Sequence, residues 1–234
     1  MFSHFSAGNK TPEPASTPSS AQSSPVPAAL LLVVGTFCLA YFCKRFLSIN
    51  DGIAVIWLAD ALTIAVLYRF PFRSWLLLLA GAYVGNVTAT VASGVDLHVA
   101  ALYSLAGIAE SFVAAGLLRF FCADGDFFGS TWHWLRFLFF GAFLSTLVGA
   151  SLGASVAALF RGFPFGDVFL FWYLADTIGI SVFLPFLHLI NADSAARILS
   201  PRKLMRLLSV SLVSLASIFL VLQVFPYPFV FVAL

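Results

Sequence analysis

Acidic side chains inside apolar stretches are the feature of this sequence most able to carry chemistry. Residues 56–64 read IWLADALTI and residues 172–180 read WYLADTIGI, so Asp60 and Asp176 each follow a tryptophan by about one helical turn. Glu110 lies within a third apolar stretch. A carboxyl group in such surroundings can hold a proton, bind a cation or form hydrogen bonds between helices. These three acids are therefore the first candidates for a functional site.

Aromatic and amide side chains accompany the acids. Trp57 precedes Asp60 by three residues and Trp172 precedes Asp176 by four, so each pair shares one helix face. An aromatic ring beside a carboxylate can hold an amine, although tryptophans in spanning helices also serve packing and interfacial anchoring. Asn86 adds an amide within another apolar stretch. The candidate ligand-binding or sensing residues are Trp57, Asp60, Asn86, Glu110, Trp172 and Asp176.

The composition requires a membrane environment. Hydrophobic residues make up 61% of the 234 residues and charged residues 9%, whereas a soluble domain has about 25% charged residues. Apolar runs of about 20 residues, the length that crosses a bilayer, follow one another along the chain. Segments of about ten residues with alternating polarity, which an outer-membrane barrel needs, are not found. We therefore predict an all-α integral membrane protein, a polytopic bundle of about seven to eight transmembrane helices.

The apolar runs define the predicted elements. Residues 1–26 are rich in Ser, Pro, Thr and Ala, and we predict that they form a disordered cytoplasmic tail. Residues 27–234 form the predicted transmembrane domain, whose last apolar run stops at Leu234, so we expect its final helix to be truncated. The predicted helices cover about 28–47, 51–69, 73–92, 97–119, 133–160, 166–190 and 204–225, with an eighth beginning near Tyr227.

Basic residues predict the orientation, because cytoplasmic loops hold an excess of Lys and Arg. Nine basic residues fall on the side of the N-terminus and three on the other. The nine are Lys10, Arg69, Arg73, Arg119, Arg136, Arg197, Arg202, Lys203 and Arg206, and the three are Lys44, Arg45 and Arg161. We predict a multi-pass protein of the inner membrane with its N-terminus in the cytoplasm. A basic patch interleaved with aromatic residues is not found, so we expect no nucleic-acid partner.

The acids need compensation at the depth predicted for them. A carboxylate at the centre of a spanning helix costs roughly 2.5–3.5 kcal/mol on insertion scales, and every Arg and Lys falls at a predicted helix end or in a loop. Either some acids are protonated and bond to neighbouring helices, or a cation, a cationic ligand or water compensates them. Both alternatives predict that Asp60, Glu110 and Asp176 face one shared interior rather than lipid.

Other reactive residue types form no constellation that predicts chemistry. Cys38, Cys43 and Cys122 lack the spacing of a disulfide or metal framework. Gly149 and Gly153, at four-residue spacing, predict close packing between helices. Nucleophile constellations and phosphate-binding loops are not found. We therefore predict no catalysis, no cofactor and no metal site in this chain.

Four motifs together carry a family resemblance. From about Ala28 to its end, the chain resembles MASE1, the membrane-associated sensor domain of bacterial signalling proteins. The most specific motif is the last one, in which an acidic residue precedes Ile-Gly and then a proline. The motifs are IWLADAL at 56–62, YVGNVTATVA at 83–92, AGIAESFVAAGLLRFF at 106–121 and WYLADTIGISVFLP at 172–185.

The resemblance implies a sensory input module, non-catalytic as it stands, of a bacterial signal-transduction system of the c-di-GMP or histidine-kinase type. Members often continue into PAS, GGDEF, EAL or histidine-kinase domains. The expected partners are the lipid bilayer, a cytoplasmic output domain or signalling protein, a small-molecule ligand and a second copy of the chain in a homodimer. The alternatives are a small transporter or proton-coupled carrier with an acidic path through Asp60, Glu110 and Asp176, and a structural anchor that recruits a signalling protein.

Overall fold

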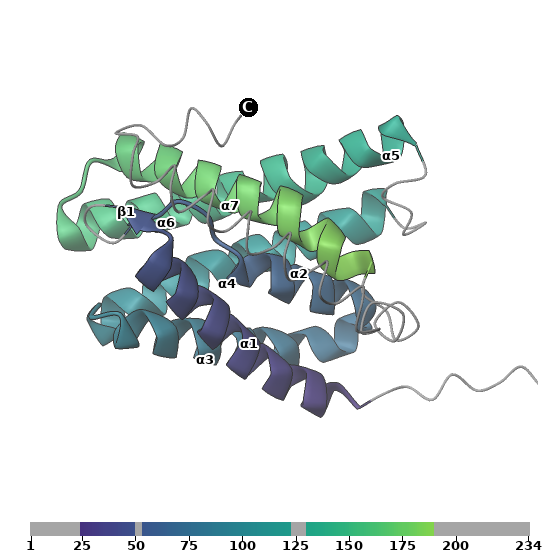
Figure 1. Ribbon diagram of the computed structural model, residues 1–234, viewed down its shortest axis with the longest axis horizontal. Coiled ribbons are helices and arrows are strands. Elements are labelled where there is room, and N and C mark those ends of the chain that lie inside the picture. Colours follow the sequence, from purple (N-terminus) through teal and green to yellow (C-terminus); the bar gives the residue numbers. More distant parts are fainter. Residues whose placement is uncertain (1–23, 50–52, 123–129, 190–234) are drawn as a thin grey trace, which may run out of the picture.

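The computed structural model describes residues 24–49, 53–122 and 130–189, which form a helical bundle (Figure 1). Its long helices are α1 (Pro25–Phe46), α3 (Trp75–Ala92), α4 (Leu97–Phe121), α6 (Ser145–Arg161) and α7 (Phe165–Leu189). Its shorter elements are β1 (Ser48–Ile49), β2 (Ile53–Ala54), α2 (Ala59–Arg69), the 3-10 turn η2 (Phe72–Ser74), α5 (Thr131–Arg136) and the π-helical segment η3 (Phe137–Leu144).

Five helical spans within the described residues are long and apolar enough to cross a bilayer: α1, η2 with α3, α4, α7, and a continuous span of 31 residues built from α5, η3 and α6. An all-helical membrane bundle is thus confirmed, apart from a two-residue β1–β2 pairing. The predicted number of seven to eight helices is not confirmed. The expected helices at 204–225 and from Tyr227, and residues 1–23 of the expected tail, lie outside the described residues, and α1 already begins at Pro25.

The helix predicted at 51–69 is wrong in its first half. Residues 53–58 are non-helical, and α2 begins at Ala59 with 11 residues, too short to span a bilayer. The backbone N–H groups of this segment form hydrogen bonds with neighbouring segments instead of within a helix. Trp57 N–H donates to the Ala175 carbonyl of α7 at 3.2 Å, and Val55 N–H donates to the Leu47 carbonyl at 2.7 Å. Irregular backbone at membrane depth is stable only where protein or water satisfies it in this way.

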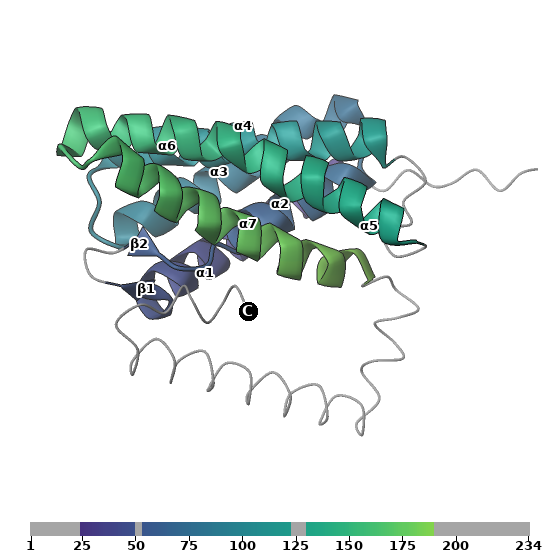
Figure 2. The ribbon, with the colours of Figure 1, turned by 90° about the horizontal axis from the view of Figure 1, so that it is seen from above.

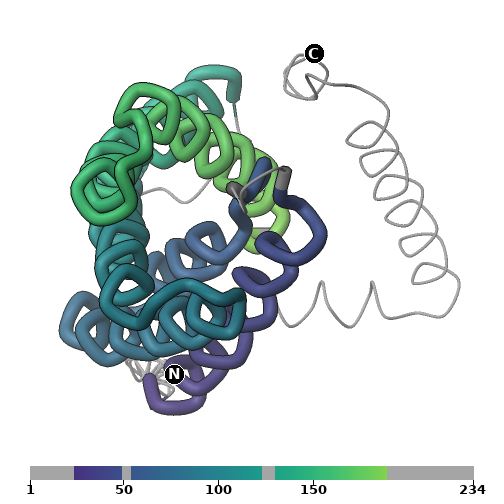
Figure 3. Tube along the Cα trace, turned by 90° about the vertical axis from the view of Figure 1, so that its left-hand side faces the viewer, coloured from purple at the N-terminus to yellow at the C-terminus, as the bar shows by residue number. Residues whose placement is uncertain are grey.

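Helix α2 lies in the interior of the bundle. It packs against α1, α3, α4 and α7, and all but one of its residues from Ala59 to Leu67 are buried. The view along the bundle in Figure 3 shows α2 among these helices. Its N-terminus therefore lies inside the bundle, and its first turn carries Asp60.

The two ends of the bundle differ. One end carries the β1–β2 pair beside the last turn of α1, and the opposite end carries α5 (Figure 2). Helices α1, α3 and α6 run toward the β1–β2 end, whereas α2, α4 and α7 run away from it. The three helices that carry acidic residues are consequently parallel to one another.

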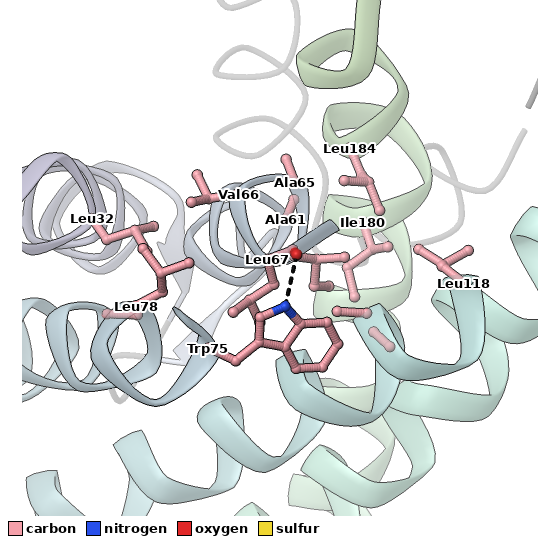
Figure 4. Packing of buried hydrophobic residues seen from close by; sticks show 14 of the residues in the cluster. Leu32, Ala61, Ala65, Val66, Leu67, Trp75, Leu78, Leu118, Ile180 and Leu184 are labelled. Carbon is pink, nitrogen blue, oxygen red and sulfur yellow. Dashed lines mark hydrogen bonds between the residues drawn. The ribbon is translucent and has the colours of Figure 1, made fainter. Parts of the chain in front are cut away.

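Packing of apolar side chains fixes α2 at the α5 end. Leu67, Trp75, Leu118, Ile180 and Leu184 come from four different helices and form one buried cluster (Figure 4). The Trp75 indole N–H donates to the Leu67 carbonyl at 2.9 Å, which satisfies a carbonyl near the end of α2. Since lipid is as apolar as these side chains, the cluster stabilises the bundle through close packing rather than through release of water.

Candidate functional site

The acidic side chains of three helices meet in the bundle interior. Asp60 of α2, Glu110 of α4 and Asp176 of α7 each offer a carboxylate oxygen, and these oxygens all lie within 4.8 Å of one another. Each residue is at most 2% exposed. The sequence-based expectation that the acids face one shared interior is confirmed by this geometry. We call these residues the carboxylate cluster.

Hydrogen bonds leave most of the carboxylate cluster unsatisfied. Both oxygens of Asp60, both oxygens of Glu110 and one oxygen of Asp176 lack a partner within the described residues. The indole N–H of Trp172, one helical turn before Asp176 on α7, also completes no hydrogen bond within the described residues. A buried acceptor without a donor costs free energy comparable to a lost hydrogen bond, and an unpaired buried charge costs more. The cluster therefore requires protons, water or a bound cationic group.

Glycines on the facing helices make room for the site side chains. A Cβ at Gly107 of α4 would lie 3.0 Å from an Asp60 oxygen. A Cβ at Gly149 of α6 would overlap the Glu110 carboxylate, and a Cβ at Gly153 would overlap the Trp172 ring. The spacing of the latter two glycines predicts only close helix packing. The structure shows that the groups packed against them are the candidate site residues.

A cavity of about 280 Å³ leads to the carboxylate cluster. Asp60 and Asp176 line it, together with Trp57, Trp172 and Asn86, so five of the six predicted site residues share this space. Glu110 is not among the lining residues and lies behind the other two acids. The turns 93–95 and 161–163 also line the cavity, which places its opening at the β1–β2 end of the bundle.

Two further polar groups are buried against the cavity without a partner. The side-chain oxygen of Asn86 and the hydroxyl of Ser104 complete no hydrogen bond within the described residues, although both side chains are less than 5% exposed. Ser104 was not predicted from the sequence. The sequence places Ser104 six residues before Glu110 in the same apolar stretch. Serines are common in spanning helices, so this position does not distinguish Ser104 as a site residue.

Basic residues line the same cavity at its opening. Lys44, near the end of α1, and Arg161, at the end of α6, are both lining residues. In the sequence these two residues contribute only to the predicted orientation. Neither was expected at a site, because their proximity depends on how α1 and α6 pack and not on any sequence spacing.

The oxygen atoms of the site favour a positively charged ligand. Carboxylate and amide oxygens are the ligands of hard cations, and a carboxylate beside an indole suits an ammonium group. The mutual distances within the carboxylate cluster would also allow it to hold a metal ion, although no metal site was expected from the sequence. Whether the site holds a metal ion or an organic cation is decided by the rest of the cavity.

Comparison with known proteins identifies the family. The MASE1 family model matches residues 27–234. The chain belongs to the MASE1 family. MASE1 is a membrane-associated sensor domain, so the sequence-based prediction of a sensory module in signal transduction is confirmed. The alternative of a small transporter is not favoured by this match. No solved structure matches the chain.

A signalling protein contains a similar MASE1 region. The chain is 24% identical over 210 residues to the probable diguanylate cyclase DgcE of Escherichia coli (strain K12). The match covers 89% of this chain and 19% of that protein, so the chain spans about a fifth of the length of its relative. The cyclase named there belongs to a part of DgcE that this MASE1 domain does not match.

Proposed function

We propose that this MASE1 domain is the input module of an inner-membrane signalling protein, and that it senses a ligand through the carboxylate cluster and its cavity. The observation that carries the proposal is the convergence of Asp60, Glu110 and Asp176 at the inner end of a cavity that opens at one end of the bundle. Buried ionisable residues in a membrane bundle are costly and mark sites of ligand or proton binding by default.

The proposed orientation places the cavity opening on the periplasmic side and the N-terminus in the cytoplasm. Among the described residues, the basic side chains at the α5 end are Arg69, Arg73, Arg119 and Arg136, and those at the β1–β2 end are Lys44, Arg45 and Arg161. The described residues alone divide almost evenly, so the orientation rests on the full sequence, in which nine basic residues stand against three.

Helix α2 offers a route for the signal. Its first turn carries Asp60, and its last turn is bonded to two other helices. Arg119 of α4 donates to the Tyr68 and Phe70 carbonyls, and Arg69 of α2 donates to the Leu187 carbonyl of α7 at 2.6 Å. A shift of α2 on ligand binding would therefore move the last turn of α7, beyond which the chain continues. The receiver in this proposal is a cytoplasmic output domain or a partner protein; the homodimer stays a prediction.

A fusion to a diguanylate cyclase or histidine-kinase output domain tests the proposal. Asp176→Asn preserves size and hydrogen bonding but removes the ability to carry charge, and Asp176→Leu removes both. We expect both variants to insert and to change the output by about fivefold or more, the lower end of typical coupling between sites. Asp167→Asn is the matched control, because Asp167 lies exposed in the first turn of the same helix. Normal output from both variants at 176 would remove Asp176 from the sensing site.

A further inference from the structure

The cavity carries opposite charges at its two ends. Asp60 and Asp176 line its inner end, where the carboxylate cluster lies. Lys44 and Arg161 line its opening, at the ends of α1 and α6. The cavity therefore carries negative charge at one end and positive charge at the other, and a purely cationic ligand would contact only the acidic end.

The charges at the opening are not neutralised by the protein. The Lys44 ammonium lies 5.5 Å from the centre of the Trp57 ring, and the Arg161 guanidinium lies 5.2 Å from the centre of the Phe163 ring. No ion pair joins either cation to an acid in the part of the chain that the structure describes, and the two cations repel each other. An anionic group between Lys44 and Arg161 would relieve that repulsion.

The inner end lacks the complementary charge. Within the described ranges, both Asp60 oxygens and one Asp176 oxygen have no hydrogen-bond partner, and the side-chain oxygen of Asn86 beside them is also unpartnered. All three side chains are at least nine-tenths buried and line the cavity. A group with several N–H donors and a positive charge satisfies these oxygens, and an ammonium group is the smallest organic group that does so.

Helix geometry sets the separation between the two ends. On α7 the cavity is lined from Val168 to Asp176, a separation of eight residues, or about 12 Å at 1.5 Å per residue. From Asn86 of α3 to Ser93, the residue that follows this helix, the lining covers seven residues, or about 10 Å by the same rise. A ligand that touches both ends is consequently elongated, with its charges several bonds apart.

Aromatic side chains form the walls between the charged ends. Trp57 and Trp172 line the cavity with Tyr103, whose ring centre lies 5.6 Å from that of Trp172. Such faces pack well against a short aliphatic chain and attract an ammonium group. The cavity volume of about 280 Å³ lies just below the usual range of ligand pockets, about 300–1,000 Å³, so the ligand must be small.

We propose that this cavity binds a small elongated zwitterion, with its ammonium group on Asp60 and Asp176 and its carboxylate or phosphate group on Lys44 and Arg161. The inference rests on the proposed sensory function of the same site and names its ligand class. A divalent cation would satisfy the carboxylate cluster but would leave Lys44 and Arg161 at the cavity opening without an anion.

Binding to the purified full chain in lipid nanodiscs tests the ligand class. The fluorescence of Trp57 and Trp172 supplies the readout, because both line the cavity. The zwitterionic probes are γ-aminobutyrate, ε-aminocaproate and triglycine, and the single-charge probes are hexylamine and caproate. We expect at least one zwitterion to bind about tenfold more tightly than both single-charge probes, a difference of about 1.4 kcal/mol. Equal affinities across the set, or binding of calcium alone with none of the zwitterions, would overturn the proposal.

Charge-removing variants locate each end of the ligand. In Lys44→Met/Arg161→Met we expect the tenfold preference for the zwitterion over hexylamine to fall to about one. In Asp176→Asn we expect both the zwitterion and hexylamine to bind at least about tenfold more weakly. Arg45→Met and Asp167→Asn remove charges from exposed positions near the same end and outside the cavity, and should leave all affinities unchanged. A preference for the zwitterion that survives in Lys44→Met/Arg161→Met contradicts the assigned anion site.

The binding experiment tests the ligand class and the output fusion tests the sensory role, so the two proposals can be contradicted independently. If a zwitterion binds through these residues but the output fusion ignores every change at 176, the ligand class stands and the sensory role of the site is wrong. If the fusion responds to Asp176→Asn but every probe binds alike, the sensory role stands and the ligand class is wrong.

Discussion

Glu110 of α4 packs directly on the backbone of Gly149 of α6, with no room for even a Cβ at that position. The same relationship holds between Trp172 and Gly153, one turn further along α6. These glycines bring α6 close to the site from the side opposite to α2. The position of Glu110 behind the other two acids therefore depends on a small residue of a helix that contributes no acid of its own.

Replacing Gly149 with alanine should displace Glu110 and destabilise the bundle. A side-chain atom forced into a filled space in a packed interior costs typically about 1–3 kcal/mol. We expect Gly149→Ala to lower the unfolding temperature in detergent, followed by circular dichroism. Gly116→Ala is the matched control on α4, where a Cβ would meet nothing within 4 Å, and should equal or exceed the parent in stability because alanine favours helix. Equal losses at both positions would show that Glu110 is not held by Gly149.

Arg119 should be hard to replace, even by lysine. Its guanidinium donates to the Tyr68 carbonyl at 3.0 Å and to the Phe70 carbonyl, and it lies 5.2 Å from the centre of the Trp75 ring. Lysine keeps the charge but loses the planar fork and the stacking. We expect Arg119→Lys to cost about 1.5–3 kcal/mol, the range for hydrogen bonds to charged groups, and to reduce the effect of Asp176→Asn on a fused output domain.

The control for that experiment is Arg136→Lys. Arg136 stacks on Trp132 at 5.2 Å, outside the buried cluster. Its replacement should change stability by less than about 0.5 kcal/mol, as is usual for surface positions. A similar loss in Arg119→Lys and Arg136→Lys would contradict the role of Arg119 at the end of α2.

A topology experiment tests the orientation. Reporters active only in the periplasm should be active when fused after Gly94 or Pro164, which lie at the β1–β2 end, and inactive after Pro71 or Ser130, which lie at the α5 end. The physical reason is the nine-to-three distribution of basic residues in the full sequence. The reverse pattern would place the cavity opening on the cytoplasmic side.

The carboxylate cluster could be predicted because burial of charge is expensive in a membrane. Asp60, Glu110 and Asp176 have no adjacent basic residues in the sequence, and lipid exposure would leave them uncompensated. A shared interior is therefore expected without any knowledge of the fold. Which side chain lies deepest could not be predicted, because it depends on Gly149 and on the packing of α6.

The break before α2 could not be predicted, because apolar residues 53–58 fit a spanning helix as well as they fit the observed segment. The segment is stabilised by a partner far away in sequence, the Ala175 carbonyl, which accepts the Trp57 N–H. Gly179, which lies on α7 together with Ala175, leaves space for the Trp57 carbonyl. Such long-range pairing leaves no periodicity in the local sequence.

The positions next to the acids also differ from a simple helical expectation. Rotation by about 100° per residue suggests that Ala61 and Thr177 face away from the interior. Both are buried in the structure, at 0% and 8% exposure, because α2 is surrounded on all sides and α7 packs on more than one helix. An exposed position on α7 is Val182, whose side chain is 69% exposed.

Access of water-soluble reagents to position 176 reports whether the carboxylate cluster lies at the end of an open cavity. In a chain whose native cysteines are replaced by alanine, single cysteines are introduced by Asp176→Cys and Val182→Cys and reconstituted in vesicles. We predict that a charged thiol reagent modifies the cysteine at 176 from the side on which Gly94 and Pro164 report, whereas the cysteine at 182 resists it and a fluorophore attached there is quenched by lipid-phase quenchers. A cysteine at 176 that reports lipid, or is modified only from the opposite side, would contradict a sensing cavity that opens at the β1–β2 end.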